Sequence, residues 1–144
     1  MTKIIAFIPA RSGSKRIKNK NILKIKKKPI LSYTIVEAKK SKVFDKVIVV
    51  TDSKKYKKIA EKYGAEVPFL RPKKTATDKS PDIAWLKWII RKLHLNENDI
   101  FSILRPTSPF RKASTIKRAW KLFNTNKKKI DSIRAVEICK QHPG

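Results

Sequence analysis

The chain contains 144 residues, of which 40% are hydrophobic and 33% are charged, and its formal net charge at pH 7 is +26. This length and apolar content exclude a disordered chain and predict one domain, residues 1–144, with a buried hydrophobic core. The one cysteine, Cys139, excludes an internal disulfide and is typical of a protein of the reducing cytoplasm. The N-terminal apolar run ends at Arg11 and no apolar run is long enough to span a bilayer, so we expect neither a signal peptide nor a membrane segment.

The excess of positive charge is compatible with a nucleic acid, an anionic membrane or a phosphorylated ligand. Of the 37 basic residues, 29 are lysines and 8 are arginines, and lysine runs such as 54–58 are typical of solvated helix faces. A nucleic-acid-binding domain would gather its basic residues on one face together with exposed aromatic residues. The lysines instead occur in nearly every segment. We therefore expect no nucleic-acid or membrane partner and keep a basic nucleic-acid-binding domain as the less favoured alternative.

Apolar runs rich in β-branched residues alternate along the chain with segments of helical periodicity. The first run ends at Pro9, and Pro29 stands at the first turn of the first predicted helix. Ser53 is predicted to cap the second helix and Gly64 to end it. The predicted strands are 3–8, 46–51, 66–70, 99–104 and 132–140, and the predicted helices are 30–41, 53–63, 82–94 and 113–124.

This alternation predicts an α/β fold with a mostly parallel sheet and helices on both faces. Ligands of such sheets bind outside the carboxyl ends of the strands. The loops that follow strands are therefore the ones in which a site is expected. Five of the eight arginines lie in these loops: Arg11, Arg16, Arg71, Arg105 and Arg111.

The first of these loops, PARSGSKRIKNKN, combines small polar residues with positive charge. Gly13 permits a tight turn, and Ser12, Ser14 and the nearby backbone N–H groups are suited to an anion-binding concavity. Arg11 and Lys20 are suited to neutralising a polyphosphate. The loop lacks the GK[ST] ending of a Walker loop and the three glycines of a dinucleotide fingerprint. A solvated basic turn is the alternative, but its position after the first strand favours a phosphate site.

Two later loops carry further candidates. LRPTSPFR, at 104–111, is stiffened by two prolines and offers two hydroxyl groups and a guanidinium, which suits a ribose or a base edge, although a simple rigid turn would look the same. FLRPKKTATDKSPD, at 69–82, is long for a connection in a compact domain, and long loops are often functional. Its Asp82 is suited either to touching a ribose or to capping the next helix. Asp52, at the end of a strand, is either a pocket residue or a helix cap, and Trp85 is expected in the core.

Four segments together resemble one family in their order and spacing: IPARSGSKRIKNKNI, FDKVIVVTDS, YGAEVPFLRP and LRPTSPFR. The chain resembles the acylneuraminate cytidylyltransferases, or CMP-sialic acid synthetases, from Ile4 to Pro143. The resemblance implies a Rossmann-like nucleotidyltransferase domain that transfers CMP from CTP to a nonulosonic acid and releases pyrophosphate. It implies that the CTP phosphates are handled by Arg11, Ser14, Lys20 and Asn21, that Arg71 lies by the cytosine, and that Thr107, Ser108 and Arg111 lie on the nucleotide side of the pocket.

Within this interpretation, Arg11 and Lys20 are the predicted catalytic residues, because charge builds on the phosphate oxygens during in-line attack. The nucleotide-binding prediction also includes Ser12, Gly13, Asp82 and Arg105. The family implies Mg²⁺ as cofactor, CTP and an acidic nine-carbon sugar as partners, a homodimer for the full-length chain, and His142 near the sugar.

The sequence departs from the family at three places. Its first loop has fewer glycines, position 105 is arginine where sialic-acid enzymes often have glutamine, and the chain ends at QHPG, where the sugar-binding segment would begin. The metal-binding carboxylates of the family would follow later still, so the metal ligands of this chain are not identified. The sequence therefore predicts a cytidylyltransferase, with a catalytically incomplete nucleotide-binding fragment as the alternative.

Overall fold

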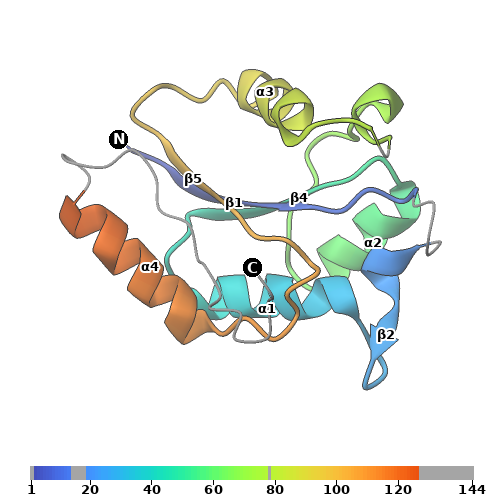
Figure 1. Cartoon of the computed structure of the whole chain (residues 1–144), viewed down its shortest axis with the longest axis horizontal. Helices are drawn as coiled ribbons and strands as arrows, with labels where there is room; N and C mark the ends of the chain where they lie inside the picture. The colour runs from blue at the N-terminus through green and yellow to red at the C-terminus, as the bar shows by residue number, and fades with distance from the viewer. Residues whose placement is uncertain (1, 14–18, 78, 127–144) are drawn as a thin grey trace, which may run out of the picture.

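A parallel sheet forms the centre of the computed structural model, which describes residues 2–13, 19–77 and 79–126 (Figure 1). Within these residues the sheet has three strands in the order β4-β1-β5, and each neighbouring pair is parallel. In register, Phe7 of the central strand lies between Ile48 and Ile103. The strands are β1 (Ile4–Pro9), β4 (Lys46–Val50) and β5 (Ile100–Ile103). The predicted parallel sheet is therefore confirmed, with strand ends within one residue of the predicted ones.

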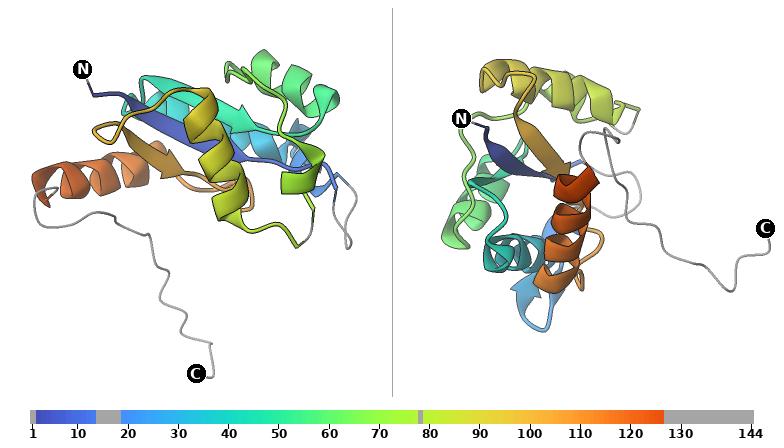
Figure 2. Two further views of the ribbon diagram at one scale, coloured as in Figure 1. Left: turned by 90° about the horizontal axis from the view of Figure 1, so that it is seen from above. Right: turned by 90° about the vertical axis from the view of Figure 1, so that its left-hand side faces the viewer.

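Helices cover both faces of this sheet, as predicted (Figures 1 and 2). Helix α3 lies on one face, and the other three helices lie on the opposite face. Ser53 caps α2, because its hydroxyl accepts a hydrogen bond from the Tyr56 N–H at 3.2 Å. The helices are α1 (Ile30–Ser41), α2 (Lys54–Lys62), α3 (Asp82–Lys92) and α4 (Ala113–Asn126).

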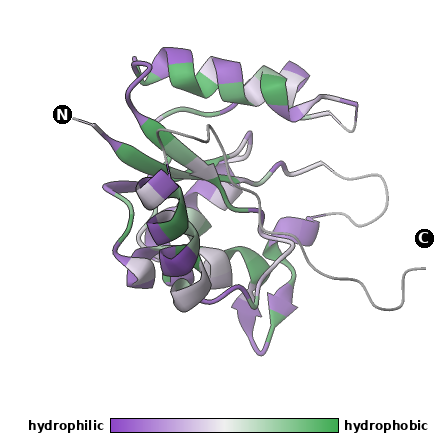
Figure 3. Cartoon of the chain, turned by 60° about the vertical axis from the view of Figure 1, so that its left-hand side comes forward, coloured by the Kyte–Doolittle hydropathy of each residue, from purple (hydrophilic) through white to green (hydrophobic). Residues whose placement is uncertain are grey.

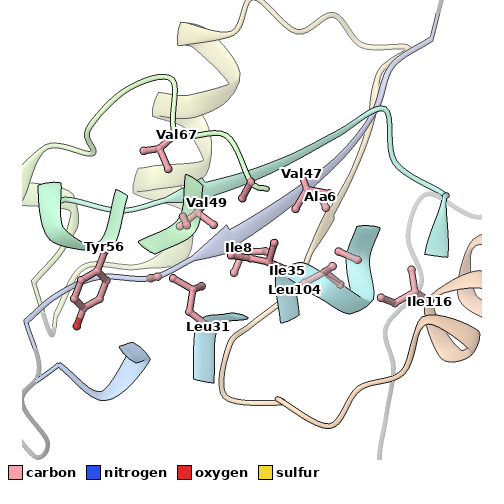
Figure 4. Packing of buried hydrophobic residues seen from close by; sticks show 14 residues of the cluster. Ala6, Ile8, Leu31, Ile35, Val47, Val49, Tyr56, Val67, Leu104 and Ile116 are labelled. Atoms are coloured by element: carbon pink, nitrogen blue, oxygen red, sulfur yellow. The ribbon is translucent and has the colours of Figure 1, made fainter. Parts of the chain in front are cut away.

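Alternation along the strands divides the core into two layers. On β1, Ile5 and Phe7 point toward α3, whose Trp85 and Ile89 are almost fully buried against them. The intervening Ala6 and Ile8 belong to the other layer, shown in Figure 4 with Leu31, Ile35, Tyr56 and Ile116 of the helices opposite. The sheet is thus buried on both sides, which explains the continuous apolar runs of its strands.

The hydropathy of the elements follows this burial. Figure 3 shows mainly hydrophobic strands, whereas α3 carries hydrophobic and hydrophilic residues in alternation along its length. One side of α3 therefore faces the sheet and the other faces water. Within the described part of the chain, no helix is both long enough and apolar enough to cross a bilayer.

The predicted strand at 66–70 is wrong. Only Glu66 pairs with the sheet, in a single parallel bridge to Ile48 in which its backbone bonds Val47 and Val49, each at 2.9 Å. Pro68 has no N–H to continue such pairing. The chain then leaves the sheet edge and returns to it at Arg71, whose N–H donates to the Thr51 carbonyl at 2.7 Å.

Other local features differ from the predicted ones. Helix α3 ends at Lys92 instead of 94, because His94 adopts a left-handed φ of 54°. Lys26 and Lys27 form a tight turn with φ of 52° and 70°, which the sequence does not signal because such turns favour Asn and Gly. The unpredicted elements are η1 (Lys20–Ile22), the hairpin of β2 (Lys24–Ile25) and β3 (Lys28–Pro29), and η2 (Lys73–Thr75). The predicted strand at 132–140 lies outside the described residues.

Candidate functional site

A pocket lies at the carboxyl ends of β1 and β5, where the α/β arrangement predicts a ligand site. Seven of the residues predicted to bind nucleotide line it, and they come from three loops and one helix start. The predicted residues in the lining are Arg11, Lys20, Asn21, Arg71, Asp82, Arg105 and Thr107. Pro9, Ser80, Trp85 and Pro106 complete it.

The described parts of the first loop, residues 11–13 and 19–21, are held in place by hydrogen bonds. The Asn21 side chain is nearly buried, and its amide donates to the Arg11 carbonyl at 3.0 Å. Asn19 has a left-handed φ of 56°, and its side-chain oxygen accepts a hydrogen bond from the Tyr56 hydroxyl at 3.2 Å. The Arg11 guanidinium donates to the Gly13 carbonyl. Asn21 therefore fixes the backbone of the loop from which Arg11 enters the pocket.

Asp52 connects this loop to the next one. Its carboxylate accepts hydrogen bonds from the Ser12 N–H at 2.8 Å and the Ser12 hydroxyl at 2.9 Å, and it pairs with the Lys73 ammonium at 3.0 Å. Burial by itself raises the pKa of Asp52, but the hydrogen bonds from Ser12 and Lys73 outweigh it and hold this pKa below its ordinary value. Asp52 is therefore charged at neutral pH. It neither lines the pocket nor caps α2, since Ser53 is the cap.

Arg71 lines the pocket and is a buried residue, with 6% of its surface exposed. It donates to the Thr75 hydroxyl at 3.3 Å and to the Thr75 carbonyl, and it lies over the Trp85 ring at 5.9 Å. Burial lowers the pKa of Arg71 to about 10, although the charge of Asp52 acts in the opposite direction. The side chain remains cationic at neutral pH and is held in one orientation.

Asp82 and Arg105 form an ion pair at the mouth of the pocket. Asp82 begins α3 and also accepts a hydrogen bond from the Trp85 indole N–H at 3.0 Å. Burial raises the pKa of Asp82, but the hydrogen bonds from Trp85 and Arg105 lower it by more, so the net pKa lies below its ordinary value. About half of each side chain in the pair is exposed, so a ligand can reach both.

Some predicted residues are not brought to the pocket. Ser12, Gly13, Ser108 and Arg111 are not among the residues that line it. Burial lowers the pKa of Arg111, and one of its guanidinium nitrogens is buried without a hydrogen-bond partner among the described residues. Ser14 and His142 lie outside the described residues. A binding role for these six residues stays a prediction.

The sequence analysis did not predict that Trp85 also lines the pocket. The prediction that Trp85 is a core residue is confirmed, because it is 1% exposed and packs edge-on against Phe7 at 6.2 Å. Its indole N–H nevertheless reaches Asp82, which stands one helical turn before it. That spacing of three residues on a predicted helix is the signal that could have revealed the contact.

The carboxylates near the pocket do not form a preformed magnesium site. The described residues contain no group of three or more His, Cys, Asp or Glu side chains that could hold a metal ion. Both oxygens of Asp52 are used by Ser12 and Lys73, and both oxygens of Asp82 are used by Trp85 and Arg105. Mg²⁺ requires nearly octahedral oxygen ligands with one or two accessible carboxylates. Neither Asp52 nor Asp82 is therefore assigned as a magnesium ligand.

The charge of the pocket suits a polyanion. Four cationic side chains line it, whereas Asp82 is the one carboxylate among the lining residues. The planar guanidinium groups can each give two parallel hydrogen bonds to phosphate or to a base edge. A lysine adds a compact charge for the same ligand. The cations are Arg11, Lys20, Arg71 and Arg105.

Comparison with known proteins agrees with this description. Residues 5–142 match the family model described as cytidylyltransferase. Over 127 residues, the chain is 49% identical to the N-acylneuraminate cytidylyltransferase of Escherichia coli, covering 88% of this chain and 30% of that protein. Over 140 residues, it is 38% identical to the CMP-N,N'-diacetyllegionaminic acid synthase of Legionella pneumophila, covering 94% of this chain and 60% of that protein.

Solved structures show the same fold. A structure of CMP:2-keto-3-deoxy-manno-octonic acid synthetase complexed with CTP superposes with a TM-score of 0.73 at 21% identity, covering 88% of this chain and 49% of that one. A cytidylyltransferase from Leptospira borgpetersenii gives a TM-score of 0.70 at 24% identity, covering 90% and 52%. These likenesses establish an α/β nucleotidyltransferase fold.

The chain spans 30% and 60% of the lengths of the two curated relatives described above. The family model nevertheless matches nearly all of this chain, and it includes the loops that build the pocket. The chain belongs to the cytidylyltransferase family, a family of nucleotidyltransferases.

Proposed function

We propose that the chain binds CTP and forms the nucleotide-binding part of an enzyme that transfers CMP to a sialic-acid-like nonulosonic acid and releases pyrophosphate. The observation that carries this proposal is the convergence of Arg11, Lys20, Arg71 and Arg105 on one pocket at the carboxyl ends of the strands. The similarity to the enzymes for N-acylneuraminate and diacetyllegionaminic acid supports a nonulosonic acid as the acceptor.

The reaction proposed here forms one P–O bond and breaks another. The anomeric hydroxyl oxygen of the sugar attacks the α-phosphorus of CTP and loses its proton to solvent. The bond from the α-phosphorus to the oxygen that bridges to the β-phosphate breaks, and pyrophosphate leaves with that electron pair. Negative charge grows on the phosphate oxygens and on the leaving group, so fixed cations at these oxygens stabilise the transition state.

The residues of the pocket have different proposed roles. Arg11 and Lys20, from the first loop, are placed to bind the phosphates and to stabilise the charge that develops there. Because Arg71 is buried, its guanidinium cannot readily change position during the reaction. Such a fixed guanidinium suits recognition of the base. Thr107 and Asp82, which line the pocket, are proposed to contact the ribose, which suits a hydroxyl and a carboxylate.

Three further parts of the proposal concern the whole enzyme. Mg²⁺ is proposed as the cofactor because it normally accompanies nucleoside triphosphates, although the described carboxylates do not fit it as they stand. A homodimer is proposed for the full-length protein from the family resemblance. The cytoplasm is proposed as its location, from the single cysteine.

Calorimetric titration of the 144-residue chain with CTP and Mg²⁺ tests the proposal. Selective binding of CTP is expected, with ATP and single-stranded DNA as controls. Binding of DNA in preference to CTP would instead favour the nucleic-acid-binding alternative. Release of pyrophosphate with a nonulosonic acid would then distinguish an active enzyme from a nucleotide-binding fragment that is catalytically incomplete.

Replacing Arg11 with alanine tests its role in phosphate binding. Arg11→Ala should weaken CTP binding by about 1.5–3 kcal/mol, the scale of a hydrogen bond to a charged group. Arg118→Ala removes the same charge from an exposed position on α4 and serves as the matched control. Equal CTP affinity of the two variants would contradict the assignment of Arg11.

A further inference from the structure

Asp52 is a buried carboxylate that the proposed reaction does not use. Its side chain is 4% exposed, and it stands two residues after Val50, the last residue of β4. It does not line the pocket and does not cap α2. Isolated charges are seldom buried, because removing a carboxylate from water is costly unless hydrogen bonds and opposite charges replace the solvent. The contacts of Asp52 therefore indicate what it does.

Two of these contacts fix the start of the first loop. Ser12 lies 40 residues before Asp52, and both its N–H and its hydroxyl donate to the carboxylate, at 2.8 and 2.9 Å. Asn21 holds the carbonyl of the preceding residue, Arg11, at 3.0 Å. The backbone between β1 and Gly13 is thus held from two sides. The starting point of the Arg11 side chain is fixed by these bonds.

The third contact attaches a different loop. The Lys73 ammonium pairs with the same carboxylate at 3.0 Å, although 79% of the Lys73 side chain is exposed. Two residues earlier, the Arg71 N–H donates to the Thr51 carbonyl at 2.7 Å. The end of β4 therefore binds the loop that starts at Arg71 at two adjacent points. Asp52 joins the two loops that supply the pocket with Arg11 and Arg71.

The charge of Asp52 has the wrong sign for attracting a polyanion. Its field favours the charged form of Arg71, whereas Arg11 disfavours it. Asp52 thus offsets the repulsion between the two arginines in the empty pocket. For an incoming triphosphate, however, a nearby carboxylate is repulsive. A benefit of Asp52 to ligand binding must therefore come from the positions that it imposes on its neighbours.

We propose that Asp52 is a positioning residue for the nucleotide triphosphate, acting through a clasp in which its carboxylate holds Ser12 of the first loop and Lys73 of the loop after Arg71. The clasp sets the separation of Arg11 and Arg71 before the nucleotide arrives. Preorganisation of this kind strengthens binding because less ordering remains to be done in the complex. This inference rests on the proposed function, because its ligand is CTP.

Asp52→Asn tests the clasp, because charge and position predict opposite results. If only charge matters, removing a carboxylate near the site tightens CTP binding. If the clasp positions the loops, the variant binds CTP about 10- to 150-fold more weakly, which is the scale of one lost hydrogen bond to a charged group. Equal or tighter binding by a variant that is folded, as judged by circular dichroism, would overturn the proposal.

Lys73→Ala tests the other side of the clasp in a variant that should fold normally, since Lys73 is exposed. Lys74→Ala removes the same charge from the neighbouring exposed residue and is the matched control. We expect Lys73→Ala to weaken CTP binding several-fold more than Lys74→Ala. Equal effects of the two substitutions would mean that Lys73 contributes only general positive charge and would overturn its part in the clasp.

Amide hydrogen exchange without nucleotide separates this inference from the proposed function. The clasp predicts that exchange at the Ser12 N–H becomes faster in Asp52→Asn, because the acceptor loses its charge. Unchanged exchange would overturn the clasp whether or not CTP binds. Failure of the wild-type chain to bind CTP, together with faster Ser12 exchange in the variant, would overturn the proposed function and the assigned ligand while supporting the clasp as a loop contact.

Discussion

Replacing Arg71 with methionine separates the stability of the pocket from its ability to bind an anion. The residue Arg71 is 6% exposed, and no carboxylate is among the hydrogen-bond partners of its guanidinium in the described structure. Burial lowers the pKa of Arg71 from its ordinary value of 12.5 to about 10. That difference corresponds to roughly 3 kcal/mol of destabilisation of the charged form.

Arg71→Met removes the cost of burying a charged side chain and keeps a side chain of similar length. The two hydrogen bonds from this charged group to Thr75 are lost, which costs about 3 kcal/mol at about 1.5 kcal/mol each, the lower value for a hydrogen bond to a charged group. The Thr75 hydroxyl keeps its bond to the Pro72 carbonyl at 2.7 Å, and the Arg71 N–H keeps its bond to Thr51. We therefore expect the two effects nearly to cancel, so that the free energy of unfolding changes by less than about 1 kcal/mol.

CTP binding, in contrast, should weaken clearly. Without the guanidinium, CTP affinity is expected to fall by about 1.5–3 kcal/mol, or roughly 10- to 150-fold. Urea unfolding measures the first effect and calorimetric titration the second. Arg91→Met, at an exposed position in the last turn of α3, should change neither by much. A loss of more than about 1 kcal/mol of stability, or an unchanged CTP affinity, would refute the reasoning.

Two further predictions concern local stability. Ser53→Ala should lower the free energy of unfolding by about 1 kcal/mol, because the α2 cap bond to the Tyr56 N–H is lost; urea unfolding measures this, and an unchanged midpoint would contradict the capping role. The pKa of Asp52 in the folded chain lies below its ordinary value, which is the value in the unfolded chain. Charged Asp52 therefore contributes its full stabilisation at a pH above the ordinary value. This stabilisation is lost as the pH falls through the folded-state pKa. The difference in unfolding free energy between wild type and Asp52→Asn should therefore shrink as the pH falls from about 5 to about 3, and a pH-independent difference would count against the charged contacts of Asp52.

The fold was largely readable from local patterns. Continuous apolar runs predict the buried strands β1 and β4, since each faces a core layer on both sides. Helical periodicity likewise predicts α1 and α3. Alternation of the two kinds of segment is enough to predict a parallel sheet, and a parallel sheet places Arg11 and Arg105 at the same edge. The pocket follows from this because connectivity dictates where strand ends meet.

The partners of each pocket residue could not be read in the same way. The sequence allowed two roles for Asp52, as a pocket residue or as a helix cap. The structure instead shows that Asp52 contacts Ser12, which lies 40 residues away in the sequence. The absence of a fourth strand of the parallel sheet at 66–70 likewise depends on how Glu66 meets Ile48. Local periodicity carries no information about such distant pairings.

The amino-acid sequence thus determined the order of strands and helices, the position of the cationic loops and the family. Contacts between distant segments are known only from the three-dimensional arrangement: Arg71 lies buried over Trp85, Arg105 pairs with Asp82, and Asp52 joins two loops. The physical reason is the range of the forces involved. The periodicity of apolar residues predicts which residues of a segment are buried, but not which distant residues they contact. An ion pair or a shared carboxylate, in contrast, forms only after folding has brought distant segments together.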